Sequence, residues 1–94
     1  MQFTILRLRD VIAQTGLSRS TIYSRISQGL WPKPVNLGGR AVGWPSREVD
    51  ALSAALIAGQ TSLEIRALVE MLHASRQNAF VDHQSNFATE AKEG

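Results

Sequence analysis

Residues 15–45 of this chain read TGLSRSTIYSRISQGLWPKPVNLGGRAVGWP, and their order of helix caps and helix breakers predicts most of the fold. Gly16 favours the left-handed backbone conformation that commonly ends a helix. Ser18 has a hydroxyl that can accept a hydrogen bond from an unpaired backbone N–H at the start of the next helix. The stretch therefore begins with a tight turn between two helices.

The helix after this turn is predicted to span 19–28 and to have two unlike faces. Ile22 and Ile26 lie four residues apart and form one apolar stripe, and Gly29 with the prolines beyond it ends the helix. The opposite face is polar and consists of Ser20, Ser24 and Ser27, flanked by Tyr23, Arg25 and Gln28. Two helices joined by a glycine-containing turn, the second with a polar outer face, are typical of the helix-turn-helix motif.

A β-hairpin is predicted over 34–44, directly after this helix. Apolar residues alternate with a polar one along its first strand, and Gly38 and Gly39 supply the positive φ angles that a tight turn requires. Arg40 follows them at the end of the turn. Because a two-stranded ribbon alone is marginally stable in water, one face of it must pack against the helices. A hairpin with a basic tip beside a helix-turn-helix is a wing.

These residues give the chain a resemblance to a known family. The resemblance is carried by Leu8, Asp10-Val11, TGLSRSTIY (15–23), Gly29, WPKPVNLGGRAVGW (31–44) and SREVDA (46–51). The chain resembles the AlpA-like family of phage regulatory proteins, which are related to small excisionases and to MerR-type winged helices. The resemblance implies a mainly α fold with a small β-hairpin, that is, a winged helix-turn-helix, to which this chain adds a further C-terminal helix.

The resemblance also implies a transcriptional regulator of phage or prophage type that binds specific sequences of double-stranded DNA. The helix over 19–28 would be the recognition helix in the major groove, and the wing would enter the neighbouring minor groove. The residues expected to bind DNA from the recognition helix are Ser18, Arg19, Ser20, Thr21, Tyr23, Ser24, Arg25 and Ser27. Those expected on the wing and its flanks are Lys33, Gly38, Gly39, Arg40 and Arg47. The phosphate contacts among them are assigned to Arg25, Lys33 and Arg47, together with Arg9.

Some of these residues have alternative roles. Arg19 could pair with Asp10 instead of DNA, and Tyr23 could cover the helix surface. Trp31 and Trp44 have apolar neighbours and are expected in the core, not as platforms for nucleobases. Relatives often carry a basic residue at the position of Ser24, so this recognition helix should depend more on hydroxyl contacts and on the wing.

The charge of the chain is concentrated in its first half. The net charge is +2 over 94 residues, but residues 1–47 hold seven basic residues and one acid, which gives +6. Residues 48–94 hold three basic residues and seven acids, which gives −4. A concentrated basic surface attracts a polyanion through counterion release, so the first half is expected to face the DNA.

Composition excludes several other classes of protein. The chain has no cysteine, which excludes disulfides and thiolate metal sites, and its length suits one small domain. His73 and His83 lack the spacing of metal ligands, and no serine has a neighbouring base, so neither a metal or other cofactor nor an enzymatic activity is expected. We expect no membrane segment and no signal peptide, and therefore a cytoplasmic, nucleoid-associated protein.

The rest of the chain is divided by its capping signals. A first helix is expected from Leu8 to Gln14, and a third from a Ser46 cap to about Ala58, with Val49, Leu52, Leu56 and Ile57 on one face. A Thr61–Glu64 capping box opens a fourth helix, whose apolar stripe is Ile65, Leu68, Val69 and Leu72. The predicted organisation is a winged helix-turn-helix over 1–60, an amphipathic helix over 61–80 and a flexible tail over 81–94.

Two alternative functions fit the same sequence. One is an excisionase, a recombination directionality factor that bends attachment-site DNA for an integrase. The other is a protein-interaction module that uses the stripe of the fourth helix and binds DNA weakly. Because a single small module contacts few base pairs, a homodimer or a cooperative array on DNA is expected, and the fourth helix is the candidate interface. An integrase or RNA polymerase is a further candidate partner.

Overall fold

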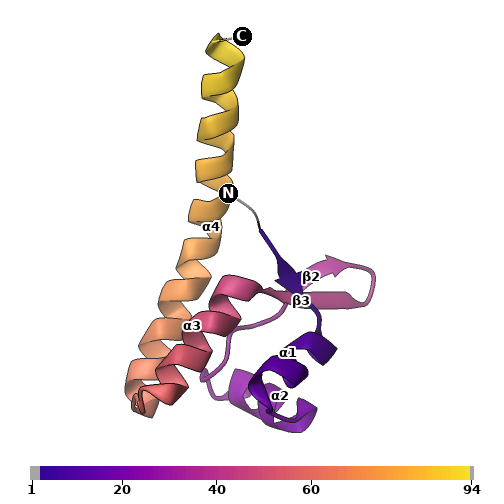
Figure 1. Cartoon of the computed structure of the whole chain (residues 1–94), viewed down its shortest axis with the longest axis vertical. Coiled ribbons are helices and arrows are strands. Elements are labelled where there is room, and N and C mark those ends of the chain that lie inside the picture. The colour runs from indigo at the N-terminus through magenta and orange to yellow at the C-terminus, as the bar shows by residue number, and fades with distance from the viewer. Residues whose placement is uncertain (1–2, 94) are drawn as a thin grey trace.

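The computed structural model describes the backbone of residues 3–93 and the side chains of residues 3–81. Its elements are β1 (Ile5–Leu6), α1 (Leu8–Thr15), α2 (Arg19–Ser27), β2 (Val35–Gly38), β3 (Ala41–Pro45), α3 (Ser46–Ile57) and α4 (Ser62–Glu93). In Figure 1, α1, α2 and the β2–β3 hairpin lie on one side of α3, and α4 lies on the other side and extends far beyond the body of the domain. The predicted winged helix-turn-helix is confirmed.

The three strands form a small antiparallel sheet in the order β1-β3-β2. The residues just before the first helix form β1, which pairs Ile5 with Pro45 and Leu6 with Trp44. This pairing places β1 very close to Gly43. A Cβ atom at Gly43 would lie 2.6 Å from Ile5 Cγ2 and 2.8 Å from the Leu6 carbonyl oxygen. β1 can therefore pair this closely with β3 only because residue 43 has no side chain.

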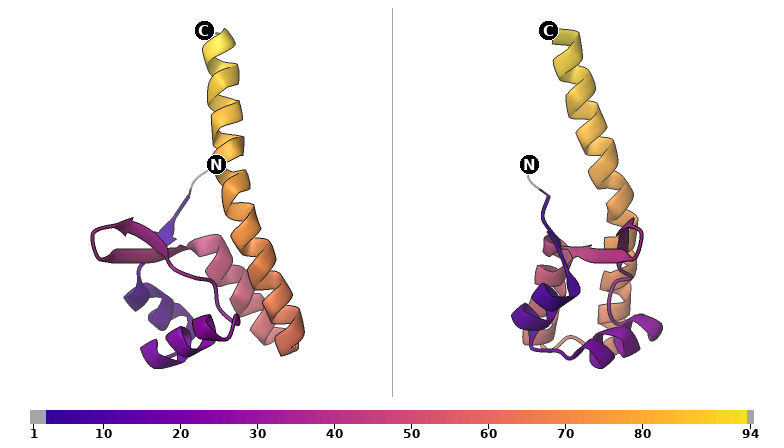
Figure 2. Two further views of the ribbon diagram at one scale, coloured as in Figure 1. Left: turned by 180° about the vertical axis from the view of Figure 1, so that it is seen from behind. Right: turned by 90° about the vertical axis from the view of Figure 1, so that its right-hand side faces the viewer.

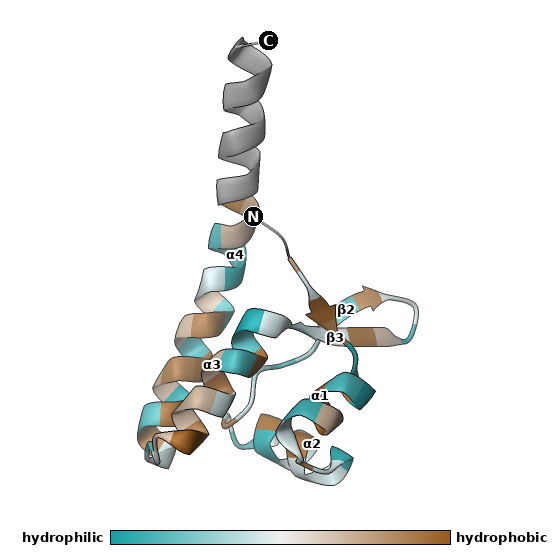
Figure 3. Ribbon diagram, in the orientation of Figure 1, coloured by the Kyte–Doolittle hydropathy of each residue, from teal (hydrophilic) through white to brown (hydrophobic). Residues whose placement is uncertain are grey.

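The core forms where the hairpin, α1, α2, α3 and α4 meet. Trp31 and Trp44 are 1% and 0% exposed, which confirms that both tryptophans belong to the core. The other buried apolar residues are Val11, Ile22, Val49, Leu52, Ala55, Ile65 and Val69. Figure 3 shows the hydrophobic residues gathered on the facing parts of α3 and α4, whereas α1 and much of α2 are hydrophilic or neutral.

The turn between α1 and α2 has the predicted caps. Gly16 adopts φ 74° and its N–H donates to the Ile12 carbonyl oxygen, so it ends α1 in the left-handed conformation. The Ser18 hydroxyl oxygen accepts from the Thr21 N–H at 3.2 Å and caps α2. These local bonds fix the entry of α2, whose Ile22 is fully buried.

The start and the face of α3 differ from the prediction. Ser46 is the first residue of the helix and not its cap, because the strand β3 continues to Pro45, which takes the capping position without a side-chain bond. The Ser46 N–H donates instead to the Thr4 carbonyl oxygen beside β1, at 2.8 Å. Ile57, expected on the apolar face, is 88% exposed, and Ala55 is buried in its place.

The fourth helix begins as predicted. The Thr61 N–H donates to Glu64 Oε1 at 3.0 Å and the Glu64 N–H donates to the Thr61 hydroxyl oxygen at 3.2 Å, which makes a complete capping box. Burial of Ile65 and Val69 in the core shows that the stripe of α4 packs on its own domain. The expectation that this stripe is exposed to a second chain or to another partner is therefore wrong, because the core of α1–α3 leaves an apolar face that the stripe covers.

The length of α4 also differs from the prediction. The amphipathic helix was expected over 61–80, but α4 continues to Glu93. The predicted flexible tail over 81–94 lies almost entirely among residues whose side chains the structure does not describe, so its flexibility stays a prediction. Within the described part of the chain, no helix is both long enough and apolar enough to cross a membrane.

Candidate nucleic-acid interface

The polar face of α2 points away from the core, as the spacing of its isoleucines predicts. Arg19, Ser20, Tyr23 and Ser24 are exposed, whereas Ile22 on the opposite face is fully buried. Ser20, Thr21, Ser24, Arg25 and Gln28 of this face, with Leu30 and Ser62 beside them, line an open polar hollow. The helix therefore presents a row of hydroxyl and amide groups on its exposed face, and its opposite face is held in the core by Ile22.

The hydroxyls of α2 are not equally free. Ser18 Oγ donates to Thr21 Oγ1 at 2.8 Å in addition to its capping bond, so both side chains are used to start the helix. Ser27 Oγ donates to the Ser24 carbonyl oxygen at 2.7 Å, a bond within its own helix. The Ser24 hydroxyl accepts from Gln28 Nε2 at 3.1 Å and still has a proton to donate. Ser20 Oγ lies 3.3 Å from Ser18 Oγ and is the donor in that contact, because Ser18 already donates to Thr21, so the Ser20 lone pairs can still accept. Ser20 and Ser24 are thus the exposed hydroxyls best placed to reach a ligand.

The first turn of α2 also carries a stacked cation. The Arg19 guanidinium carbon lies 5.8 Å from the centre of the Tyr23 ring. This stacking holds the arginine along the outer face of the helix. Asp10, the alternative partner considered for Arg19, instead accepts a hydrogen bond from the Arg7 backbone N–H at 3.2 Å.

The tip of the wing has the predicted backbone. Gly38 and Gly39 adopt φ angles of 109° and 56°, which residues with a side chain rarely adopt. The Gly38 N–H donates to Asn36 Oδ1 at 2.8 Å across an irregularity in the pairing of β2 with β3. Arg40 is exposed at the end of this turn. Figure 2 shows the hairpin projecting from the body, clear of α4.

The remaining predicted cations are spread over the surface. Arg9 on α1 and Lys33 before the wing are exposed. Arg47 is exposed at the start of α3, with its guanidinium carbon 5.9 Å from the centre of the Phe3 ring. It borders a largely apolar groove between β1 and α4, so the structure does not bring Arg47 together with the tip of the wing.

Three further polar residues, which the sequence did not assign to the DNA-binding site, meet beside the segment that precedes β2. Arg76 of α4 donates to both carboxylate oxygens of Glu48 of α3, at 2.8 and 2.7 Å, and Glu48 is 5% exposed. His73 Nε2 accepts from the Lys33 N–H at 3.0 Å. Burial lowers the pKa of His73 from its usual 6.5, and the neighbouring Arg76 cation lowers it further.

A signal for these residues was present in the sequence. His73 and Arg76 follow the buried Ile65 and Val69 at positions that continue the inner face of α4. Polar residues on the inner face of an amphipathic helix need partners, because an unpaired buried charge or donor is costly. That rule indicates that partners exist, but it does not identify Glu48 or the backbone of Lys33.

Among the residues whose side chains the structure describes, no group of three or more histidine, aspartate or glutamate side chains is placed to hold a metal ion. His83 lies outside those residues.

A polar-faced α2 held by a capped turn, next to a hairpin with a basic tip, defines a winged helix-turn-helix protein. The family model described as "Prophage CP4-57 regulatory protein (AlpA)" matches residues 4–52. The chain belongs to this family of AlpA phage regulatory proteins.

Two relatives support the assignment. The chain is 48% identical over 59 residues to the uncharacterized protein ORF88 of Enterobacteria phage P4, a match that covers 63% of this chain and 67% of the phage protein. It is 40% identical over 52 residues to the DNA-binding transcriptional activator AlpA of Escherichia coli K12, covering 49% of this chain and 74% of that protein. No solved structure matches the chain.

Proposed function

We propose that this chain is a DNA-binding transcriptional regulator of phage or prophage type that recognises specific sequences in double-stranded DNA. The observation that carries the proposal is the exposed polar face of α2, a helix that lies on the same side of α3 as the hairpin with Arg40 at its tip. Membership of the AlpA family supports it, as does the similarity to a relative described as a DNA-binding transcriptional activator.

In this proposal α2 is the recognition helix in the major groove. The groove is wide enough for a helix, and each base pair presents a distinct pattern of donors and acceptors there. Ser20 and Ser24 are exposed on the outer face; the Ser24 hydroxyl can donate to a base edge, and the Ser20 hydroxyl can accept from one, or donate if it gives up its 3.3 Å contact with Ser18. Ser18 and Thr21 act indirectly, because their side chains hold the first turn of the helix in place.

The wing provides the second contact. Arg40 at its tip would enter the minor groove or lie along its phosphates, where the narrow geometry of A·T-rich DNA attracts arginine. Arg9, Arg25 and Lys33 would contact phosphates and position the domain without reading bases. The net charge of +6 over residues 1–47 supports this orientation, with the acidic half of the chain directed away from the DNA.

Two sets of substitutions test the proposal. Arg40→Ala should weaken binding to specific and random DNA alike, flatten the slope of log K against log salt by up to about one unit, and reduce A·T preference beside the site. Arg40→Lys is the matched control, because it keeps the charge and should restore most of the salt slope. If affinity, slope and preference all stay at wild-type values in Arg40→Ala, the wing does not contact DNA.

The serines should behave differently. Ser20→Ala or Ser24→Ala should cost about 1–3 kcal/mol on the preferred site and little on random DNA, because hydroxyl contacts to base edges carry sequence information. Ser75→Ala is a matched control on α4, where the hydroxyl donates to the Met71 carbonyl oxygen within its own helix. Equal losses on both kinds of DNA would mean that α2 contacts only phosphates.

We also propose that the protein binds DNA as a homodimer, with half-sites about one helical turn apart. Because the stripe of α4 is covered, the contact must use other residues. Phe80 and Val81 are adjacent on α4 and are 61% and 54% exposed, so this part of the helix carries apolar surface that a second chain could cover. Phe80→Glu should then lower the mass measured by sedimentation at several concentrations, with and without DNA.

Ile57→Glu is the control for this measurement. Ile57 is also strongly exposed, at 88%, but it lies at the end of α3 and should not affect association. A wild-type chain that remains monomeric at high micromolar concentration, both free and on DNA, would contradict the proposed dimer.

A further inference from the structure

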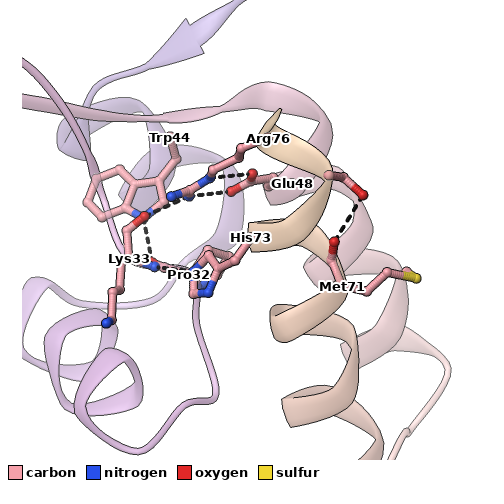
Figure 4. Close-up of polar contacts among 8 residues, drawn as sticks. Pro32, Lys33, Trp44, Glu48, Met71, His73 and Arg76 are labelled. Carbon is pink, nitrogen blue, oxygen red and sulfur yellow. Dashed lines mark hydrogen bonds and ion pairs between the residues drawn. The ribbon is translucent and has the colours of Figure 1, made fainter. Parts of the chain in front are cut away.

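The segment between α2 and β2 is held by side chains from distant parts of the chain. Trp44 Nε1 donates to the Pro32 carbonyl oxygen at 2.8 Å. The Lys33 N–H donates to His73 Nε2 at 3.0 Å, and the Lys33 carbonyl oxygen accepts from Arg76 Nη2 at 2.7 Å. Figure 4 shows the indole, imidazole and guanidinium groups converging on these two linker residues. We call Trp44, His73 and Arg76 the linker clamp.

One member of the clamp, Arg76, is itself held in place by α3. Arg76 is held by two hydrogen bonds to the buried carboxylate of Glu48 on α3. Further down α4, Arg66 Nε donates to the Gln28 carbonyl oxygen at the end of α2, at 2.9 Å. α4 therefore contacts both the end of the candidate recognition helix and the linker that leads to the wing.

The position of the linker affects both DNA-contacting elements. The outer strand of the wing, β2, begins directly after the linker, and α2 ends directly before it. The inner strand, β3, is secured separately by its pairing with β1. Gly29 and Leu30 of the linker donate to carbonyl oxygens in the last turn of α2, whereas the Pro32 carbonyl oxygen and the N–H and carbonyl groups of Lys33 are bonded by the clamp. Loss of the clamp would free the junction of α2 and β2.

From this arrangement we propose that His73 and Arg76 are positioning residues for DNA binding. By fixing Pro32 and Lys33 they hold β2 and Arg40 at a set orientation to α2, so that both elements meet their grooves without further ordering. The physical basis is preorganisation, since a contact that is already ordered in the free protein costs less entropy on binding. The proposal rests on the proposed function, in which α2 and the wing bind DNA together. It assigns to α4 a role in binding without a DNA contact of its own.

The first test uses the free full-length protein and a matched pair of variants. His73→Gln keeps an acceptor for the Lys33 N–H, whereas His73→Leu removes it at similar volume. We expect residual dipolar couplings of the β2 amides, measured relative to those of α2, to be averaged toward smaller values in His73→Leu and to stay near wild type in His73→Gln. The Lys33 amide resonance reports loss of the bond directly. Wild-type couplings in His73→Leu, with the Lys33 bond lost, would overturn the proposal.

The second test measures energetic coupling on DNA. Arg40→Ala should weaken specific binding about tenfold in the wild-type and His73→Gln backgrounds but only about twofold in His73→Leu, because a loosely held wing contributes less binding energy to lose. If the clamp only stabilised the fold, its loss in His73→Leu would lower the melting temperature and leave the effect of Arg40→Ala unchanged among folded proteins. That unchanged effect would refute the positioning role.

Two possible outcomes of these tests require a separate interpretation. If Arg40→Ala has no effect in the wild-type background, the proposed wing contact fails, and the couplings of the free protein still decide whether the clamp orients the wing. If His73→Leu does not fold, Arg76→Lys replaces it. A lysine keeps a charge near Glu48, but its single nitrogen lacks the fork geometry in which two guanidinium nitrogens reach both carboxylate oxygens and the Lys33 carbonyl oxygen. The same reduced effect of Arg40→Ala is expected in that background, and a full tenfold effect would contradict the proposal.

Discussion

Replacing Arg76 by methionine should strongly destabilise this domain, because it removes the partner of a buried carboxylate. Glu48 is 5% exposed, and both of its oxygens accept from Arg76. Methionine keeps much of the aliphatic packing but leaves this charge and the Lys33 carbonyl oxygen without their donor. Breaking a buried ion pair in this way costs about 3–5 kcal/mol.

The lower end of that range is expected here, because the Arg76 side chain is 25% exposed and water partly screens the pair. A loss of about 3 kcal/mol corresponds to a fall in melting temperature of roughly 12–24 °C for a domain of this size. Thermal and urea unfolding followed by circular dichroism at pH 7 would measure both quantities.

Two companion variants sharpen the result. Changing both Glu48 and Arg76 to methionine should recover most of the loss, since neither charge then remains buried. Arg66→Met is a matched control on the same helix, where only a hydrogen bond to an exposed carbonyl oxygen is lost, at a cost of about 0.5–1.5 kcal/mol. A loss below about 1 kcal/mol in Arg76→Met, or no recovery in the double variant, would refute the argument that the Glu48 charge needs its partner.

Three further outcomes follow from the packing. Gly43→Ala should cost about 1–3 kcal/mol in urea unfolding, because its methyl group would meet β1 at less than 3 Å; unchanged stability would mean that β1 is not closely paired. Ile65→Ala should cost about 2–5 kcal/mol while Leu63→Ala, 77% exposed, costs little, and similar small effects would show that α4 does not pack on the core. Because the pKa of His73 is lowered in the folded protein, neutral His73 contributes to the free energy of unfolding above pH 6.5. This contribution is lost as the pH falls from 6.5 through the pKa of the folded state. The urea midpoint should therefore fall more steeply on acidification in the wild type than in His73→Gln, and parallel curves would contradict this. The charged groups that act on His73 are Arg76 and Glu70 of its own helix, Glu48 of α3 and Lys33 of the linker.

The amino-acid sequence by itself determined the elements whose causes are local. Gly16 and Ser18 set the turn between α1 and α2, Gly38 and Gly39 set the tip of the wing, and Thr61 with Glu64 starts α4. Each of these depends on residues at most four positions apart. The outward direction of the α2 serines was predictable for the same reason, because the period of a helix places them opposite its buried isoleucine.

Only the tertiary structure decided where distant groups meet. The bonds of the linker clamp and its glutamate join residues 12, 28, 40 and 43 positions apart, and no local pattern selects such partners. The same is true of Ser46, which sequence placed as a cap but which bonds to the backbone of Thr4 once β1 pairs with β3. The stripe of α4 could be identified from its period, but the surface that covers it could not. That choice depended on the apolar face left open by the packing of α1, α2 and α3, and a face of that kind exists only after the chain has folded.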